Sequence, residues 1–162
     1  MVERVTPLER ARRLIDENDN MTVATADASG VPWVSPVFYA PDSEHNLYWV
    51  SAKRARHSEN IRTNEHVGIV IFETRPATDA VYVSGAAVEL NDPDDVATGM
   101  AVMAGKQQPE RWQIDSVADV TGGGPWRIYR ATPKTIEVRL ERMEDHKAIV
   151  DREPADFRQS HE

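Results

Sequence analysis

Short segments rich in valine, isoleucine and threonine recur along the chain and are separated by polar turns, a pattern that favours strands over helices. Residues 66–73 (HVGIVIFE) and 79–90 (DAVYVSGAAVEL) are the densest of these segments. The predicted strands are residues 21–26, 31–40, 47–51, 66–73, 79–90, 126–132 and 134–140. Short turns join the first three, which predicts an antiparallel meander.

Helical patterns are found in fewer places. Thr6 and Glu9 form a capping-box pattern around Pro7, and apolar residues recur at helical spacing after it. Two further helices are predicted at residues 53–63, which are mostly polar, and at residues 91–104. The balance of about seven strands against a few helices predicts a mainly β fold, a small barrel with peripheral helices.

Proline and glycine interrupt two of the predicted strands. Pro32 and Pro36 cannot donate to a sheet ladder, so the strand at residues 31–40 should lie at an edge, or meet a bulge or a ligand there. Gly85 lies inside the strand at residues 79–90 and predicts a bulge or the close approach of another backbone.

Length and composition set the number of domains. The 162 residues are 40% hydrophobic, which is enough for one core and not for two. Residues 1–140 are therefore expected to form a single domain, and the polar residues 141–162 a flexible C-terminal tail.

Charge and cysteine content exclude several classes of function. The 27 acidic residues outnumber the 19 basic ones, giving a formal charge of -8 that disfavours nucleic-acid and membrane partners. The absence of cysteine removes disulfides, thiolate metal sites and thiol catalysis. The chain has no apolar segment near the roughly 18–20 residues of a membrane helix and no secretory signal pattern, so a cytoplasmic location is expected.

Basic residues gather at one point in this acidic chain. Lys53, Arg54, Arg56 and His57 lie where a predicted strand ends and a helix begins, with Asn60 one turn further on. Helix starts favour anions, and arginine grips phosphate in bidentate fashion. The cluster therefore indicates a phosphate site, although an ordinary solvated charge run explains it equally well.

Two other segments are weaker candidates. The proline in Val34-Ser35-Pro36-Val37 leaves backbone groups free for the polar edge of a planar ring, although a plain edge strand is the simpler explanation. Residues 122–127 (GGGPWR) match no phosphate-binding loop and favour a flexible linker, in which Trp126 either stacks on a ring or joins the core.

The five histidines form no paired motif, so no metal site is expected, and no residue stands out as catalytic.

Residues 14–140 resemble the pyridoxamine 5′-phosphate oxidase-like, FMN-binding split-barrel family. Several strings carry the resemblance together through their order and spacing. They are MTVAT at 21–25, GVP at 30–32, VSPVFY at 34–39, LYWVS at 47–51, the segment from Asn60-Ile61 to Asn64-Glu65-His66-Val67, and VYVSGAA at 81–87.

The resemblance implies a split β-barrel of about six to seven antiparallel strands and a homodimer with FMN at the subunit interface. Residues 34–37 would line the flavin ring, and Trp126 and Arg127 would close over it from the second subunit. The phosphate-binding group would run from the end of one strand into the next helix. Its implied members are Ser51, Ala52, Lys53, Arg54, Arg56, His57 and Asn60.

The implied activity is hydride transfer at the flavin to or from an unidentified small molecule. The family usually has lysine where this chain has His57, which keeps two alternatives open: a deazaflavin-dependent reductase, or a non-catalytic flavin or haem binder. The C-terminal motifs of the true vitamin-B6 oxidases are absent, so oxidation of pyridoxamine phosphate itself is not expected.

Overall fold

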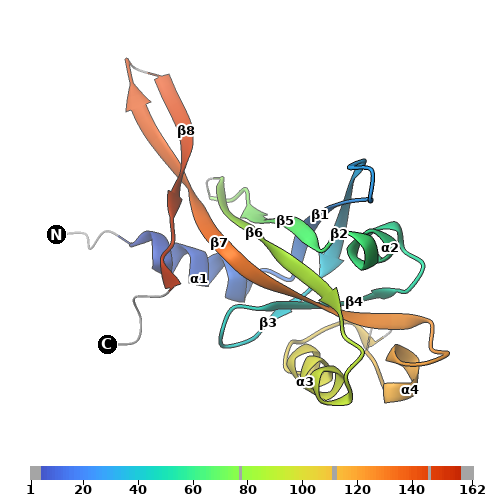
Figure 1. Ribbon diagram of the computed structural model, residues 1–162. Helices are drawn as coiled ribbons and strands as arrows, with labels where there is room; N and C mark the ends of the chain where they lie inside the picture. The colour runs from blue at the N-terminus through green and yellow to red at the C-terminus, as the bar shows by residue number, and fades with distance from the viewer. Residues whose placement is uncertain (1–4, 77, 111–112, 146, 158–162) are drawn as a thin grey trace.

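Residues 5–76, 78–110, 113–145 and 147–157 are described by a computed structural model (Figure 1). Over these ranges the protein is a mainly β fold with four helices. The strands are β1 (Asn20–Ala26), β2 (Pro32–Phe38), β3 (Ala40–Pro41), β4 (Leu47–Ala52), β5 (His66–Glu73), β6 (Asp79–Glu89), β7 (Trp126–Glu144) and β8 (Lys147–Pro154). The helices are α1 (Pro7–Glu17), α2 (Arg56–Thr63), α3 (Pro93–Ala104) and α4 (Val117–Val120). No described helix is both long and apolar enough to cross a membrane.

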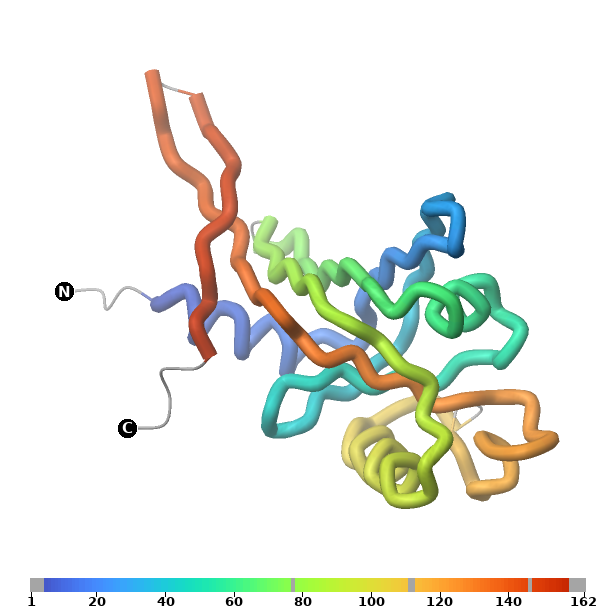
Figure 2. Tube along the Cα trace, viewed as in Figure 1, coloured from blue at the N-terminus to red at the C-terminus, as the bar shows by residue number. Residues whose placement is uncertain are grey.

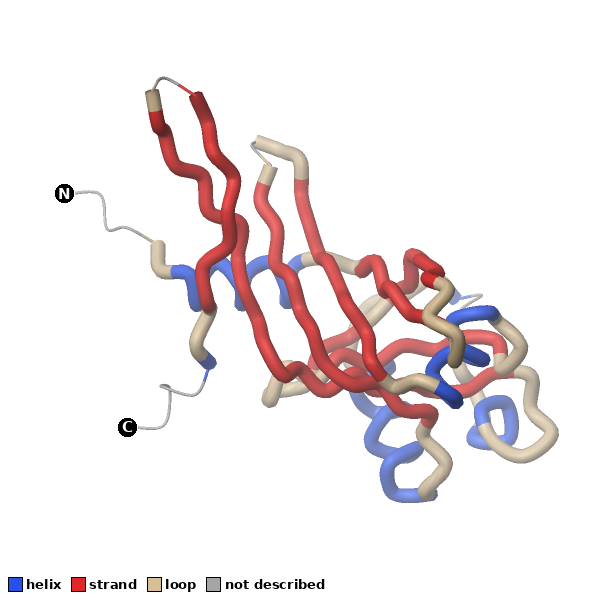
Figure 3. Tube along the Cα trace, turned by 45° about the horizontal axis from the view of Figure 1, so that its top comes forward, coloured by secondary structure: helices blue, strands red, loops and turns tan. Residues whose placement is uncertain are grey.

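All eight strands belong to one antiparallel sheet that curls without closing. Its order is β2-β1-β5-β6-β7-β4-β3, and β8 pairs with β7 off this path. The predicted split barrel is confirmed, with the opening on the side where β2 has no ladder to β4. Figure 3 shows the strands of the sheet in red. β2 pairs only with β1, so the two prolines lie on an edge strand, as the sequence predicts.

The two final predicted strands are one long strand, β7, that runs through Pro133. Pro133 lies opposite Gly85, and the register between β6 and β7 shifts at this point so that Lys134 is left without a partner. A Cβ atom on Gly85 would lie 2.2 Å from the carbonyl oxygen of Thr132. The missing side chain of Gly85 lets the backbones approach, and the bulge accommodates a proline that cannot donate.

Two apolar clusters lie on opposite faces of β4 and β7. The larger one fills the barrel, is covered by α1, and includes Trp49, whose ring stacks on Tyr129 at 5.4 Å. The smaller one lies under α3 and α4 and includes Tyr48 and Ile128. Because neighbouring residues of β4 point into different clusters, the strand is buried at Leu47, Tyr48 and Trp49 in succession.

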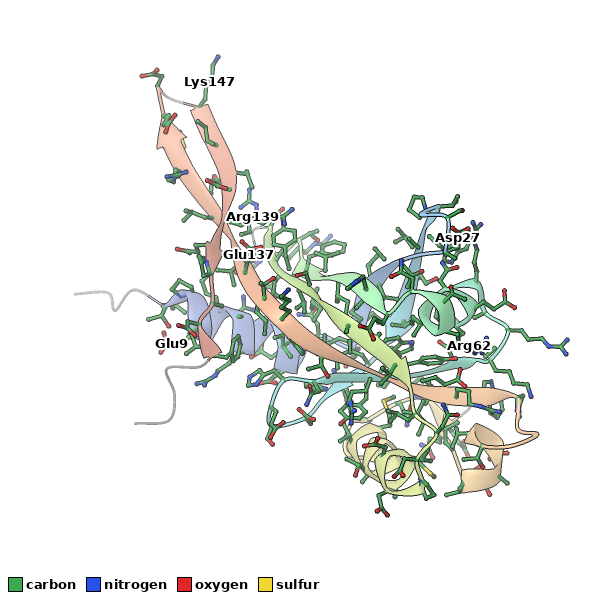
Figure 4. All side chains as sticks on the ribbon, viewed as in Figure 1. Glu9, Asp27, Arg62, Glu137, Arg139 and Lys147 are labelled. Atoms are coloured by element: carbon green, nitrogen blue, oxygen red, sulfur yellow. The ribbon has the colours of Figure 1, made fainter. Side chains whose placement is uncertain are left out.

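The C-terminal segment is not the unstructured tail that the sequence suggests. Residues 141–144 extend β7 and residues 147–154 form β8, and together they make an arm that projects away from the helices α3 and α4 (Figures 1 and 2). Lys147 lies at its tip (Figure 4). The arm is polar because both faces meet solvent, and pairs such as Arg142 with Asp151 at 2.8 Å link its strands. Residues 158–162 of the predicted tail lie outside the described residues.

Candidate functional site

A cavity of about 490 Å³ lies where the barrel is split, between β2 and β4. Its walls come from both strands, the start of α2, the end of α3 and the start of β7. The lining residues are Asn20, Pro36, Val37, Phe38, Val50, Ser51, Ala52, His57, Met103, Gln108, Gln113, Ile114 and Trp126. The structure therefore brings six of the predicted site residues together: Pro36, Val37, Ser51, Ala52, His57 and Trp126.

The path of the chain after β4 explains how these residues meet. β4 ends at Ala52, a turn follows, and α2 begins at Arg56, so the first helical turn lies beside the cavity. The N-cap residue is Ala55, which provides no side-chain hydrogen bond to the helix start. The first backbone N–H groups of α2 therefore lack a side-chain cap and can serve an anion.

His57 links the two strands that border the split. Its Nδ1 lies 3.1 Å from the Ser35 hydroxyl on β2, and its Nε2 lies 2.8 Å from the Ser51 hydroxyl on β4. The indole N–H of Trp33 donates to the same Ser35 oxygen at 3.0 Å. Burial lowers the pKa of His57 below its ordinary value of 6.5, so the neutral imidazole is favoured, with one nitrogen donating and the other accepting.

The rest of the basic cluster lies apart from His57. Arg54 and Arg56 line a separate open hollow of about 610 Å³ beside the turn between β1 and β2, and Asp27 and Glu59 line it with them. The Arg56 guanidinium lies 4.7 Å from the centre of the Trp33 ring, a cation–π contact. Lys53 lies in the turn before α2, where its backbone carbonyl accepts a hydrogen bond from Arg62.

Asn60 also lines the hollow of Arg54 and Arg56, whereas Val34 and Arg127 lie elsewhere. The buried Asn60 amide donates to the Thr25 hydroxyl at 3.0 Å and so joins α2 to β1. Val34 is 56% exposed on the edge strand and does not line the cavity.

The Arg127 guanidinium is used inside its own loop. It donates to the backbone carbonyls of Gly122, Gly124 and Trp126. It also lies 3.6 Å from a carboxylate oxygen of Glu89. Arg127 therefore fixes the glycine-rich loop that carries Trp126 to the cavity.

Several lining residues carry no signal in the sequence. Phe38 and Val50 adjoin predicted positions, but Met103, Gln108, Gln113 and Ile114 come from α3 and the segment after it. Only the packing of α3 against β4 and β7 brings them to the split. No local motif marks such residues, because their common feature is a position in space.

Comparison with known families gives a clear result. The model of the family described as pyridoxamine 5′-phosphate oxidase matches residues 8–139, most of the chain. The chain belongs to this pyridoxamine 5′-phosphate oxidase family. No curated protein matches its sequence.

Solved structures of the same fold differ in what they bind. A haem-binding protein from Mycobacterium smegmatis has a TM-score of 0.70 and 19% identity, with 95% of this chain and 60% of that chain covered. The haem storage protein HutZ from Vibrio cholerae has a TM-score of 0.61 and 20% identity, with coverage of 81% and 94%. An FAD-binding protein from Mesorhizobium loti has a TM-score of 0.64 and 20% identity, with coverage of 85% and 97%.

These identities establish the fold and leave the ligand to be argued from the site. This chain spans 60% of the length of the Mycobacterium smegmatis protein and 61% of that of another protein of the same fold, Atu2129 of unknown function from Agrobacterium tumefaciens. Within the described ranges of this oxidase-family chain, no three histidine or acidic side chains are grouped so as to hold a metal ion.

The cavity residues fit a flavin. Pro36, Val37, Val50 and Trp126 offer apolar faces for a planar ring, and the Ser51 hydroxyl lies among them. The volume is within the roughly 300–1,000 Å³ typical of pockets for organic ligands. The start of α2 adds uncapped N–H groups for a phosphate.

Proposed function

We propose that this protein is an FMN-binding oxidoreductase that transfers a hydride between the flavin and a small molecule. The observation that carries the proposal is the position of the cavity between β2 and β4, beside the uncapped first turn of α2. An apolar slot next to an anion-binding helix start matches a ligand with a flat ring at one end and a phosphate at the other.

The chain's own residues would bind and orient the flavin. Pro36, Val37 and Trp126 would pack against the ring, and the hydroxyl of Ser51 would bond its polar edge. The N–H groups at the start of α2 would hold the phosphate, with Arg56 turning in from the neighbouring hollow. The bound flavin supplies the redox chemistry, while the protein supplies binding, orientation and electrostatics.

The first experiment is an absorption spectrum of the purified protein, followed by titration with FMN. Arg56→Ala should weaken FMN binding by about 1.5–3 kcal/mol, roughly 10- to 150-fold, because a charge-assisted hydrogen bond is lost. Arg142→Ala is the control, since Arg142 lies on the β7–β8 arm, away from α2 (Figure 1), and its removal takes away the same charge. Equal FMN affinity in the two variants would remove Arg56 from the site.

The same spectra test the two alternative cofactors. A deazaflavin would absorb in a different band from FMN. Haem is supported by His57 and Met103, which both line the cavity and are residue types that ligate haem iron. The imidazole would first have to give up one of its two serine bonds. A strong haem band without FMN binding would replace the flavin proposal with haem binding.

We also propose that two copies of the chain form the working unit, with the cofactor at their interface. Support comes from an uncovered face of the sheet, where Val34, Ala24, Gly68 and Ser84 follow one another across β2, β1, β5 and β6. All four are exposed or half-buried, and Phe72 nearby is 52% exposed. Sedimentation velocity should give twice the chain mass of 18.2 kDa, and Val34→Glu should lower it. A monomer at micromolar concentration would contradict this proposal.

A further inference from the structure

A second cavity, of about 280 Å³, adjoins the first under the segment that links α3 to α4. Its floor is the cross-strand pair of Val50 on β4 and Ile128 on β7. All the other lining residues come from α3 and the residues after it. These are Met100, Met103, Ala104, Lys106, Gln107, Gln108, Gln113, Ile114 and Asp115.

The two cavities share part of their lining. Val50, Met103, Gln108, Gln113 and Ile114 line both of them. A molecule in the second cavity would therefore lie beside a ring in the first. That is the relation expected between a cofactor and the reactant it meets.

The polar groups of the second cavity are mainly uncharged amides. Gln107, Gln108 and Gln113 line it, and their side chains make no hydrogen bond to the described part of the protein. Each amide offers both donors and an acceptor. Met100 and Met103 supply flexible apolar surface that adapts to flat rings.

The charges around this cavity disfavour an anion. The Lys106 ammonium lies 4.5 Å from the centre of the Tyr39 ring and 3.7 Å from Asp19, and it donates to the Asn18 carbonyl. Asp115 also lines the cavity and is exposed to solvent. An anionic ligand would lose hydration here without gaining a free cation from the described lining residues, and it would meet the Asp115 carboxylate.

We propose that this second cavity is the reactant subsite and that it takes an uncharged, planar ring carrying a carboxamide or a similar carbonyl group. The apolar floor would hold the ring, and the glutamine amides would pair with the carboxamide edge. The assignment rests on the proposed flavin function, since it makes the first cavity the cofactor site.

The methionines allow each cavity to be observed separately. Met100 lines only the second cavity, whereas Met103 lines both. Met21 is buried in the barrel core and Met143 is exposed on the arm, so both serve as internal controls. With ¹³C-methyl methionine labelling, nicotinamide should shift the Met100 and Met103 signals and leave those of Met21 and Met143 unchanged.

Nicotinate is the matched probe, because it has nearly the same shape and carries a negative charge. It should shift Met100 at least tenfold more weakly than nicotinamide does. FMN should shift Met103 and leave Met100 close to its free position. If FMN moves neither signal, the flavin function fails, while the response of Met100 to nicotinamide still decides the second cavity by itself.

A substitution should reverse the preference for neutral ligands. Gln113→Lys places a cation in the lining, so nicotinate should bind at least tenfold more tightly than it binds the unchanged protein. Val117→Lys is the control, since Val117 is exposed on α4 and lines neither cavity. The proposal is overturned if nicotinamide leaves Met100 unmoved, if nicotinate binds as well as nicotinamide, or if both lysine variants behave alike.

Discussion

His57 shows how one side chain can take the place of backbone pairing. β2 and β4 have no ladder between them, yet both imidazole nitrogens are engaged, one by a hydroxyl on each strand. A neutral ring can satisfy this arrangement by donating to one serine and accepting from the other. The histidine therefore ties together the two sides of the split at the cavity.

This arrangement makes stability depend on pH. Burial lowers the pKa of His57 below 6.5, so the folded protein binds fewer protons than the unfolded chain as the pH falls below that value. The contribution of neutral His57 is fully present above 6.5 and is lost as pH falls through the lowered pKa. The free energy of unfolding should therefore decrease as the pH falls below about 6.5.

His57→Gln separates this effect from other titrations, because glutamine keeps a donor and an acceptor but does not ionise. The variant should lose less stability than the unchanged protein over the same interval, as measured by urea unfolding. His45→Gln is the comparison variant. Burial also lowers the pKa of His45, which lies far from the split, so this variant removes a similar titration without touching the serine hydrogen bonds. Parallel stability curves for His57→Gln and the unchanged protein would contradict the assignment.

The sequence predicts the basic cluster and the helix start around His57, but it does not predict the hydrogen bonds that the imidazole makes. The basic cluster and the helix start are readable locally, because they are adjacent along the chain. The two serine partners are 22 and 6 residues away, and only the curl of the sheet brings Ser35 to the ring. Arg56 and His57, although adjacent, line different hollows because successive residues of a helix point in different directions.

At the scale of the elements, the close approach of β6 to β7 depends on a single glycine, Gly85. Gly85→Ala would place a Cβ atom 2.2 Å from the Thr132 carbonyl oxygen, which is backbone and cannot move aside cheaply. We expect a loss of about 1–3 kcal/mol in the free energy of unfolding, the usual cost of overpacking. Chemical denaturation measures it directly.

Gly68→Ala is the matched control on the neighbouring strand β5. A Cβ atom there would meet only the Ala24 Cβ at 3.9 Å, an ordinary contact. Its stability should change by less than about 0.5 kcal/mol. Equal losses in the two variants would mean that the close approach at Gly85 does not limit the structure.

The sequence predicts a helix or strand well where one face of that element is buried. α1 follows its capping box and buries Ala11, Leu14 and Ile15. The β7–β8 arm was missed because both of its faces meet solvent, so the sequence shows no alternation from which to infer a strand. Its base is nevertheless anchored, since Ala155 after β8 is 5% exposed and belongs to the barrel core.

At the scale of the whole molecule, ligand binding should appear as thermal stability. A ligand that binds only the folded state at 100 times its dissociation constant adds about 2.7 kcal/mol. For a chain of 162 residues this corresponds to a rise in Tm of roughly 5–11 °C with FMN. Differential scanning fluorimetry would measure it, with riboflavin, which lacks the phosphate, as the control. Equal shifts with both ligands would mean that the α2 start does not bind the phosphate.

The edge strand β2 also affects how the molecule behaves at high concentration. Exposed edges of sheets recruit strands from other molecules and so initiate aggregation. On β2 two of the seven residues, Pro32 and Pro36, have no N–H to offer an incoming strand. The two prolines thus make this edge a poor template for intermolecular sheets, and they should help to keep the acidic chain in solution during synthesis and storage.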